Sequence, residues 1–419
     1  MAWDKDQAEG ELAKWFTPSK PATKNYVERG TLDRTLFREF AQQGRQVLVF
    51  GPTGAGKTSM VLDNLERLKS RYGTTYIRVT MTNKTTIESF LADIAFKLGL
   101  TRQVQLVDTD ESHSKVGGNF KLFHWFSVGA DGENQRSQQR IVERYTGSDD
   151  FAILEEALFK RNTVLVVDDM ENLTDTAEEL RIRLAEIAKN MSDDAVNYED
   201  SYAKIVFVGI ATTAEQLWAD VQSLKSRLAT IAVPYLNQEE SQRIIQLGWE
   251  KADLKSTVEQ VKRTVYISSG IGKVVHDLGQ KTGYAAVDAN NRVIKSQYID
   301  HAIREIFEVN ELDYESSFQK AKNKTSTKTT VRNYVLYAMA NDDRMTMTVQ
   351  DILKAVNQLR NDHEKKANSI SPALTQLKSP NFGILTSDNR HSWRFIDPMF
   401  KAYVREHKDE LLLKSERKN

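Results

Sequence analysis

Residues 51–58 contain the feature that most constrains the fold of this chain. They read Gly-Pro-Thr-Gly-Ala-Gly-Lys-Thr, a complete match to the pattern G-x-x-x-x-G-K-[ST]. Glycines in such a loop let the backbone turn closely enough to direct its N–H groups at phosphate oxygens. The lysine supplies an ammonium for the outer phosphates, and the threonine supplies a hydroxyl for a magnesium ion. The pattern predicts a loop that binds the phosphates of a nucleotide.

The residues on either side of this loop strengthen the interpretation. Residues 46–50 form a short apolar run, which is typical of a buried parallel strand. Residues 59–70 place Val61, Leu62, Leu65 and Leu68 on one face of a helix. A helix that follows the loop directs the positive end of its dipole at the same anion. We therefore expect nucleotide contacts from Gly51, Pro52, Thr53, Gly54, Ala55, Gly56, Lys57, Thr58 and Ser59.

A second acidic element lies about 110 residues further along the chain, where the apolar run 163–167 ends in Asp168 and Asp169. Hydrolysis of a nucleotide needs carboxylates beside the magnesium and beside the attacking water. We expect Asp168, with Thr58, to hold magnesium, and Asp169 to orient or deprotonate the water. Glu171 is the reserve candidate for that second role. Solvated acids often follow a strand, but their combination with a phosphate-binding loop favours the catalytic interpretation.

Positive charge is also needed where the γ-phosphate departs, and two residues are candidates for supplying it. Arg227 follows the fourth apolar run, and Lys273 opens a later helical pattern. Either residue is equally well explained as a solvated surface cation. The sequence leaves both assignments open.

Composition restricts the class of protein. The chain has 419 residues, of which 40% are hydrophobic and 28% charged, as in soluble globular proteins with two or three domains. No apolar run approaches the roughly 20 residues that cross a bilayer, and the first residues lack a signal-peptide pattern. The absence of cysteine excludes disulfides and thiolate chemistry, and the seven histidines show no metal-ligand spacing. We expect a cytoplasmic protein that makes no membrane contact.

The order of elements predicts an α/β fold. Apolar runs at 46–50, 75–80, 163–167 and 204–209 alternate with helical patterns, which indicates a parallel sheet wrapped by helices. Within the core, residues 104–145 read as an insertion containing a hairpin at 115–130, with a subunit or partner contact as its expected role. The expected units are an N-terminal segment (1–24) with an amphipathic stretch, the phosphate-loop core (25–233), a helical unit (234–315), a linker (316–329), a C-terminal domain (330–405) and a charged tail (406–419).

The C-terminal domain has the pattern of a winged helix-turn-helix. Three helices are predicted over 330–340, 348–359 and 369–377, followed by short strands at 382–387 and 392–396. Residues 316–419 hold 19 Lys and Arg against 11 Asp and Glu, whereas residues 1–315 hold 39 against 47. This asymmetry indicates either nucleic-acid contact or charge complementarity between domains or subunits. Charge alone does not separate the two.

These motifs together resemble the AAA+ and STAND group of ATPases, near its origin-initiator-like and bacterial or archaeal STAND families. The resemblance implies ATP and Mg²⁺ as ligands, a helical lid over 234–315 that presents Lys273 as a sensor, and Arg227 directed at a neighbouring subunit's γ-phosphate. It also implies that the segment ending in Arg29 packs on the adenine. The matching stretches are Gly51–Thr58, Val164–Asp169, Arg227–Glu240, Ser269–Lys273, Tyr26–Arg29 and the winged helix ending in Trp393–Phe400.

The chain departs from the common pattern of that group at three positions. Asp169 stands where many AAA+ members have glutamate, and its shorter carboxylate implies slow turnover. Lys273 stands where arginine is common, and a lysine offers a point charge in place of a planar fork. After the fourth strand, Thr212 is the only nearby polar candidate for a further sensor.

Three functions agree with these observations. The first is an ATPase that acts as a slow conformational or assembly switch, as a homo-oligomer through its core and with an unidentified protein partner. The second is a DNA-binding initiator-like or loader-like ATPase, with the third helix of its winged domain in the major groove. The third is a scaffold that binds ATP without hydrolysing it, against which the acidic pair argues. The expected phosphate contacts with DNA are Lys365, Lys366, Lys378, Arg390 and Arg394, and the few base-reading candidates are Ser371, Thr375 and Gln376.

Overall fold

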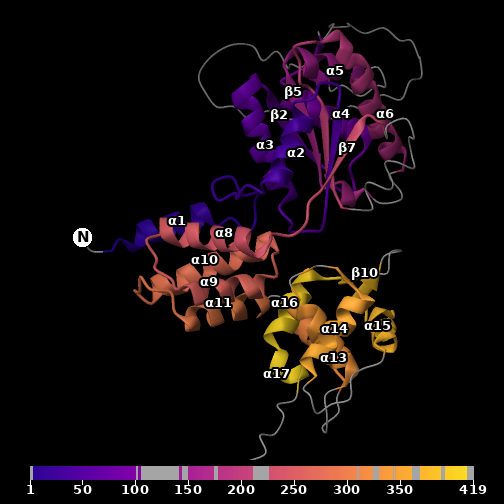
Figure 1. The fold of residues 1–419 in the computed structure, drawn as a ribbon. Helices are drawn as coiled ribbons and strands as arrows, with labels where there is room; N and C mark the ends of the chain where they lie inside the picture. The colour runs from indigo at the N-terminus through magenta and orange to yellow at the C-terminus, as the bar shows by residue number, and fades with distance from the viewer. Residues whose placement is uncertain are drawn as a thin grey trace, which may run out of the picture.

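The computed structural model contains three bodies: an α/β core, a helical lid below it and a C-terminal unit beside the lid (Figure 1). The structure describes residues 3–100, 102–104, 141–143, 150–173, 178–210, 226–308, 311–323, 330–342, 344, 346–360, 369–387 and 392–412. The predicted hairpin at 115–130 and the residues Thr212, Lys365, Lys366 and Arg390 lie outside these ranges.

A five-stranded parallel sheet forms the centre of the core. Its order is β2 (Thr75–Thr80), β5 (Thr163–Asp168), β6 (Ile205–Gly209), β1 (Gln46–Phe50) and β7 (Leu228–Ala232). In β1, Val47 lies opposite Val206 of β6 on one side and Ala229 of β7 on the other. β5 and β6 are buried throughout, which explains why they read as continuous apolar runs. The predicted fold class, a parallel phosphate-loop sheet followed by helices, is confirmed.

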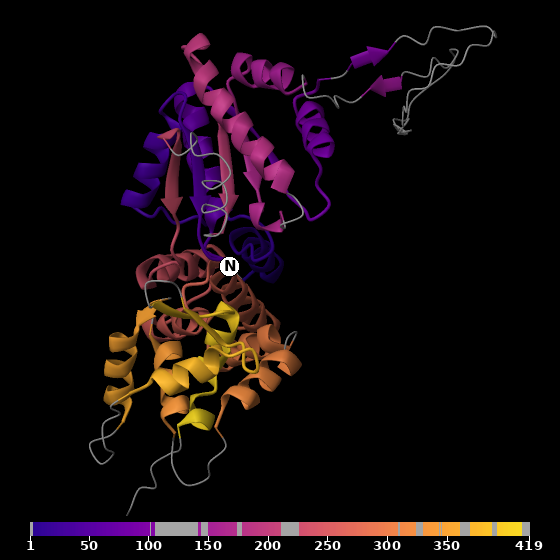
Figure 2. The ribbon, with the colours of Figure 1, turned by 90° about the vertical axis from the view of Figure 1, so that its right-hand side faces the viewer.

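Helices cover both faces of the sheet, as Figure 2 shows. On one face, α2 (Thr31–Phe40) and α3 (Lys57–Tyr72) pack on Val47 and Val49. On the other face, α4 (Ile87–Lys97), α5 (Asp150–Lys160) and α6 (Glu178–Asp194) pack on Leu48. Short 3-10 helices follow β5 at Met170–Asn172 and α6 at Ala195–Asn197. Alternate residues of β1 thus belong to two separate apolar cores.

Three strands of the core were not among those predicted from the sequence. The four predicted strands are joined by a fifth, β7, at one edge of the sheet. Its residues alternate between buried and exposed over only five positions, so no long apolar run marks it. At the base of the predicted insertion, β3 (Arg102–Val104) pairs antiparallel with β4 (Ile141–Glu143).

The lid contains four consecutive helices and a fifth from the start of the chain. The four are α8 (Gln238–Lys251), α9 (Val258–Ser268), α10 (Gly272–Asp288) and α11 (Ser296–Glu308). The predicted amphipathic stretch near the N-terminus is α1 (Lys5–Trp15), which lies along α8 and α10 (Figure 1). The ring of Phe16 fills the space beside Gly248 and Gly279, where a Cβ would come within 2.3 Å of it. These glycines are needed so that Phe16 can enter the lid.

The C-terminal unit combines helices with a small antiparallel sheet. Its sheet has the order β8 (Met347–Thr348), β10 (Ser392–Phe395), β9 (Leu385–Ser387). The helices and strands follow one another in the order predicted for a winged helix-turn-helix. Additional helices precede and follow them. The helices are α12 (Glu311–Ala321), α13 (Val331–Asn341), α14 (Val349–Leu359), α15 (Ser371–Lys378), α16 (Pro398–Glu406) and α17 (Lys408–Leu411).

Two predicted boundaries of this unit are wrong. The expected linker at 316–329 is helical up to Ala321, because Phe318 is fully buried beside Tyr403 and anchors α12. The expected tail at 406–419 includes α17, whose Leu411 is fully buried. Both stretches are polar in composition, but Phe318 and Ala321 in the first and Leu411 and Leu412 in the second pack on the unit.

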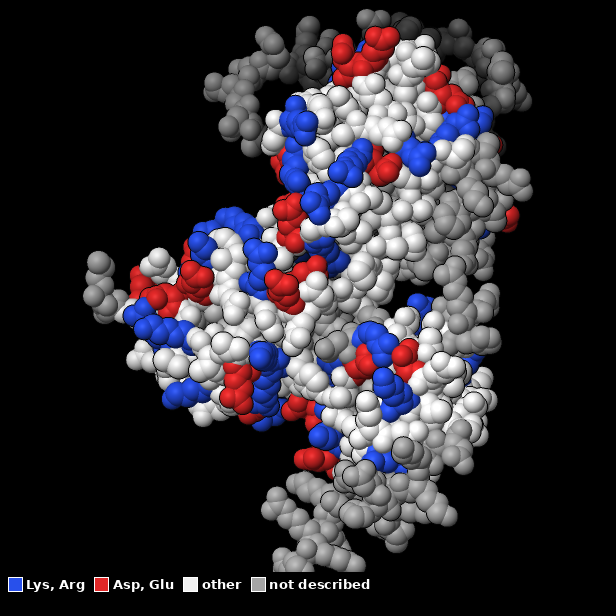
Figure 3. Space-filling view, in the orientation of Figure 1, with Lys and Arg blue, Asp and Glu red and all other residues white. Residues whose placement is uncertain are grey.

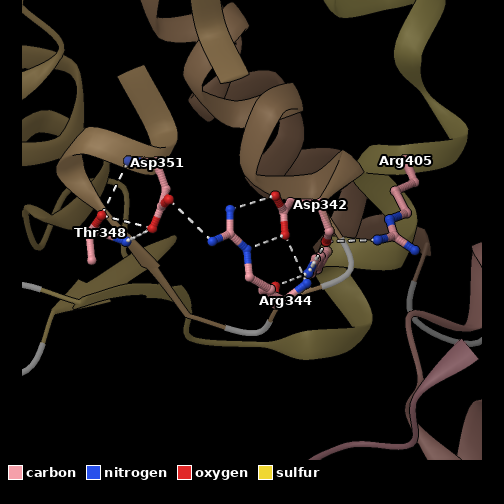
Figure 4. A network of polar contacts seen from close by, with 6 residues as sticks. Asp342, Arg344, Thr348, Asp351 and Arg405 are labelled. Atoms are coloured by element: carbon pink, nitrogen blue, oxygen red, sulfur yellow. Dashed lines mark hydrogen bonds and ion pairs between the residues drawn. The ribbon is translucent and has the colours of Figure 1, made fainter. Parts of the chain in front are cut away.

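Arg405 joins the C-terminal unit to the lid, and Figure 4 shows it beside Asp342 of the C-terminal unit. Its buried guanidinium donates to the carbonyl oxygens of Ala340, Asp342 and, in α9 of the lid, Tyr266. The same guanidinium stacks at 4.5 Å over the Tyr266 ring. Because one guanidinium bonds to Tyr266 in the lid and to Ala340 and Asp342 in the C-terminal unit, this contact links the two bodies. Within the described ranges, none of the helices combines the length and apolarity that spanning a bilayer requires.

Candidate nucleotide site

The predicted phosphate loop has the backbone that phosphate binding needs. Gly54 and Gly56 adopt φ angles of +79° and +83°, a left-handed region in which side chains are strained. Gly56 directly precedes α3, so the free N–H groups of the first helical turn face the loop. β1 and α3 therefore position the loop as the sequence predicts.

Lys57 is held inside the loop. Only 8% of the residue is exposed, and its Nζ donates to the carbonyl oxygens of Gly51 and Pro52, both at 3.1 Å. Burial lowers the pKa of Lys57, while the charges of Glu171 and Asp168 act to raise that pKa. Because the acids and carbonyls support the ammonium, the loop contains a fixed positive charge directed at any bound phosphate.

The two predicted magnesium ligands are in contact. Asp168, at the end of β5, is fully buried. The hydroxyl of Thr58 donates to its carboxylate, with oxygen–oxygen distances of 3.1 and 3.3 Å. The backbone N–H of Asp169 donates to the same carboxylate at 2.9 Å. A hydroxyl and a carboxylate side by side are oxygen donors of the kind that Mg²⁺ prefers.

Asp169 and Glu171 line the same pocket just beyond β5. Asp169 has a φ of +57°, which turns the chain sharply after the strand. Burial raises the pKa of Asp169, with a further contribution from Asp168, and burial also raises the pKa of Glu171. The Oε2 atom of Glu171 is buried without a hydrogen-bond partner among the described residues. Both carboxylates are thus placed to accept a proton or a water, and the structure does not choose between them.

The end of the pocket away from the acids is built from the N-terminal segment. Residues 17–22 and 25–27 line it, although the sequence predicted only a linker before Asn25. The segment is fixed to α3 because the Ala22 N–H donates to Ser59 Oγ at 2.9 Å. The Tyr26 hydroxyl donates to buried Asp33 at 2.8 Å, which holds the next residues in place. This arrangement supplies a place for a base beside the phosphate loop.

Residues of the lid form a further part of the pocket wall. The Gly272 N–H donates to Gly54 O of the phosphate loop at 2.8 Å, and the Tyr235 hydroxyl donates to Thr53 O at 3.1 Å. Lys273 lines the pocket, in agreement with its predicted position. His276 also lines it and accepts a hydrogen bond from the Thr17 N–H at 3.2 Å. Burial lowers the pKa of His276 to about 4, so the ring is neutral at pH 7.

Arg29 and Arg227, the remaining predicted cations, both bond to groups of the protein. Arg29 lines the pocket, but its guanidinium donates to Ala55 O at 2.7 Å and Pro234 O at 2.8 Å. It therefore fastens the phosphate loop to the segment that enters the lid. Arg227 is not among the pocket-lining residues, and it forms an ion pair with Asp193 at 2.7 Å. A contact of Arg227 with a neighbouring subunit stays a prediction.

Sequence reasoning missed Arg78. This residue lies in the edge strand β2, and its guanidinium pairs with Asp168 at 2.8 Å. An isolated charge in an edge strand is a common surface feature, so the sequence pattern did not indicate Arg78 as a site residue. The available signal was its place two residues before the end of a strand, because ligands of α/β sheets bind near the carboxyl ends of the strands.

The residues present fit a magnesium–nucleotide complex. The cavity measures about 290 Å³, close to the lower limit of roughly 300 Å³ typical of small-molecule sites. It contains the glycine loop, one buried ammonium and the hydroxyl–carboxylate pair, and its wall includes an unpartnered carboxylate oxygen of Glu171. The loop matches an anion, and the oxygen donors match a hard divalent cation.

The parallel sheet and the glycine loop are those expected of a P-loop nucleotide-binding core. Residues 41–217 match the family model described as the AAA domain, so the predicted resemblance to AAA+ ATPases is confirmed for the core. Membership of the STAND group stays a prediction. No curated protein matches the chain.

Several solved structures are similar to the whole chain. One is Cdc6p from Pyrobaculum aerophilum, with 13% identity, a TM-score of 0.48, and coverage of 95% of this chain and 97% of that one. A Walker-type ATPase of Pyrococcus abyssi has 12% identity and a TM-score of 0.49, covering 94% and 99%. The Orc1 protein of Aeropyrum pernix, solved in complex with DNA, has 16% identity and a TM-score of 0.44, covering 96% and 97%.

Proposed function

We propose that this protein is a magnesium-dependent ATPase whose nucleotide state sets the position of its lid and C-terminal unit. The observation that carries the proposal is the hydrogen bond of 2.8 Å from Gly272 N in the lid to Gly54 O in the phosphate loop. Because Gly54 belongs to the loop that would cradle phosphates, a bound nucleotide competes for the space in which loop and lid meet. Nucleotide binding and lid position are therefore coupled.

The lid and the segment leading into it contact the phosphate loop at one end and the C-terminal unit at the other. Tyr235, between core and lid, reaches the phosphate loop through Thr53 O. Tyr266, in α9 of the lid, bonds to Asn341 through its hydroxyl and to Arg405 through its carbonyl oxygen. A movement of the lid is thus transmitted directly to the C-terminal unit. This path gives the switch a mechanical output, which acts on a protein partner or on further copies of the chain.

Each pocket residue has a role in the proposed reaction. Residues 51–59 hold the phosphates, and Thr58 and Asp168 hold magnesium, which neutralises charge on the phosphates. Asp169 accepts a proton from the attacking water or orients that water, and Glu171 supports it. Assembly through the core, with Arg227 directed at a neighbour's site, belongs to the same proposal, as does slow turnover caused by the short Asp169 side chain.

Replacing each acid by its amide tests the catalytic assignment. Asp169→Asn is expected to bind ATP as the wild type does but to hydrolyse it about 100-fold more slowly, because a general base contributes roughly 10²–10⁴ in rate. Glu171→Gln is the matched variant and should slow turnover less. Binding is measured by calorimetry and turnover by phosphate release. Full turnover in both variants would contradict the assignment, and a loss confined to Glu171→Gln would transfer the role to that residue.

DNA binding of the origin-initiator type is the second candidate function. It is supported by the outer face of α15, where Ser371, Thr375 and Gln376 are exposed, and by the exposed Arg394 on β10. Lys378, the remaining described cation of this surface, already donates to Ser387 Oγ at 2.7 Å. The described residues of this region therefore offer few base-reading groups, together with the exposed Arg394, which also lies within electrostatic reach of Tyr235 beside the lid.

A duplex titrated against the full-length protein at several salt concentrations tests this candidate. Each phosphate contact contributes about −0.9 to the slope of log affinity against log salt. Arg394→Ala is expected to make that slope shallower by about one contact. Arg344→Ala, which removes an arginine already paired with Asp342, should leave it unchanged. Absence of binding at low salt would eliminate this function.

A further inference from the structure

Arg78 brings a second arginine to the catalytic end of the pocket. It lies in β2, and the neighbouring strand β5 ends in Asp168. Its Nε and Nη2 atoms both lie 2.8 Å from Asp168 Oδ2. About a third of the side chain is exposed, and it lines the pocket with Lys57, Thr58 and Asp169. The guanidinium is thus accessible to a ligand while it pairs with an acid.

This ion pair uses the oxygen that magnesium binding requires. Asp168 accepts hydrogen bonds from Arg78, from the Thr58 hydroxyl and from the Asp169 N–H. A Mg²⁺ ion keeps several bound waters, and each water that a carboxylate holds needs an acceptor oxygen. Two nitrogens of the Arg78 guanidinium already contact Asp168 Oδ2. A water bound to magnesium would therefore compete with Arg78 for this oxygen. Both oxygens of Asp168 are available to magnesium and its bound waters only when Arg78 pairs with another group.

A γ-phosphate is such a partner. The planar guanidinium fork binds carboxylate and phosphate with the same bidentate geometry. The other arginine that lines the pocket, Arg29, is bonded to the carbonyl oxygens of Ala55 and Pro234. Arg78 instead faces the acids, within electrostatic reach of Asp169. It lines the same pocket as Lys57 and Thr58, the residues that would hold the outer phosphates.

We propose that Arg78 is a positioning residue that exchanges partners within one subunit, leaving Asp168 for the γ-phosphate of ATP and so freeing Asp168 to hold magnesium. ADP has no γ-phosphate and leaves the Arg78–Asp168 pair in place. Arg78 therefore makes the site distinguish ATP from ADP and links magnesium binding to the triphosphate. This inference rests on the proposed function, because it requires ATP and magnesium in this pocket.

The test compares nucleotide affinities of the full-length wild type and Arg78→Ala by calorimetry, using ADP and a non-hydrolysable ATP analogue at several magnesium concentrations. The variant is expected to bind the ATP analogue roughly 10- to 100-fold more weakly, since it loses a charge-assisted fork, and to bind ADP unchanged when magnesium is absent. In addition, the magnesium concentration that half-saturates the ADP complex should fall several-fold, because Asp168 is free from the start. A residue that only supports the fold would not produce this pair of opposite changes.

Two further variants complete the design. Arg78→Lys keeps a charge beside Asp168 but loses the fork, so it folds with the pair intact and should show an intermediate ATP-to-ADP affinity ratio. Arg71→Ala removes an exposed arginine of α3, on the surface where Lys and Arg gather with Asp and Glu over α2 and α3 (Figure 3). It should bind both nucleotides as the wild type does.

The outcomes separate this inference from the function on which it rests. Equal loss of ATP-analogue and ADP affinity in Arg78→Ala, or no loss of either, overturns the exchange of partners while leaving an ATP-binding protein. A wild-type protein that binds neither nucleotide overturns the proposed function, and this inference with it. A lowered ATP-to-ADP affinity ratio together with the magnesium shift supports the exchange.

Discussion

Lys57→Ala is expected to weaken ATP binding by at least about 100-fold, close to 3 kcal/mol, the upper range for a hydrogen bond to a charged group. The loss is large because Lys57 is the buried cation at the centre of the loop and because Asp168, Asp169 and Glu171 would then face the phosphates without it. Calorimetric titration of the variant with magnesium and ATP measures the effect.

Lys69→Ala provides the matched control for this substitution. Lys69 lies in the same helix, α3, but it is exposed and pairs with Glu66 at 3.7 Å on the surface. Its loss should leave ATP affinity unchanged. Burying the Lys57 ammonium costs hydration free energy, which offsets the hydrogen bonds that this side chain makes. The nucleotide-free Lys57→Ala protein should therefore melt near the wild-type temperature. ATP affinity within about threefold of wild type in Lys57→Ala would show that the nucleotide binds elsewhere.

Removal of Arg405 should have the largest effect on stability. Arg405→Leu removes the donor to Ala340 O in a buried contact, and a buried acceptor left unsatisfied costs about 1–3 kcal/mol. The part-buried oxygens of Asp342 and Tyr266 also lose this donor, but they keep hydrogen bonds from Lys401 Nζ and the Ser269 N–H. We expect the free energy of unfolding to fall by about 1–3 kcal/mol. The C-terminal unit should also separate from the lid, which limited proteolysis detects as faster cleavage between the two.

Arg344→Ala is the control from the same network (Figure 4). Arg344 pairs with Asp342 at 3.0 Å and Asp351 at 3.2 Å, but more than half of its side chain is exposed. Exposed ion pairs contribute less than about 1 kcal/mol. A stability loss in Arg405→Leu no larger than in Arg344→Ala would show that the carbonyl oxygens find water or other donors, and that Arg405 does not hold the two bodies together.

The phosphate end of the site was predictable from sequence because its chemistry is local. The loop at 51–58 and the acids after β5 each lie within a few residues, and a parallel sheet brings the ends of its strands to one edge. Thr58 and Asp168, 110 residues apart, meet for that reason. The lid's Lys273 reaches the pocket as the resemblance implied, because the helix that carries it begins against the phosphate loop.

The remaining features depend on contacts that a local pattern does not contain. The short edge strand β7 owes its pairing to β1, and α12 owes its position to a buried phenylalanine and a buried alanine in a polar stretch. Arg78 looks like a surface charge until β2 is placed beside β5. The N-terminal segment reads as a linker because its partners, among them Ile244 and His276, lie more than 200 residues away. Hydrophobic periodicity does not encode such pairings.

The packing of α1 into the lid has a consequence for movement. The chain leaves the lid after Phe16, crosses into the core, and returns to the lid at residues 233–237, so two covalent crossings join the bodies. A body attached by one strand can swing in any direction, whereas a body attached by two strands turns mainly about the line between them. The lid therefore has essentially one rotational degree of freedom relative to the core. A single well-chosen distance between the two is then sufficient to report the angle of the lid.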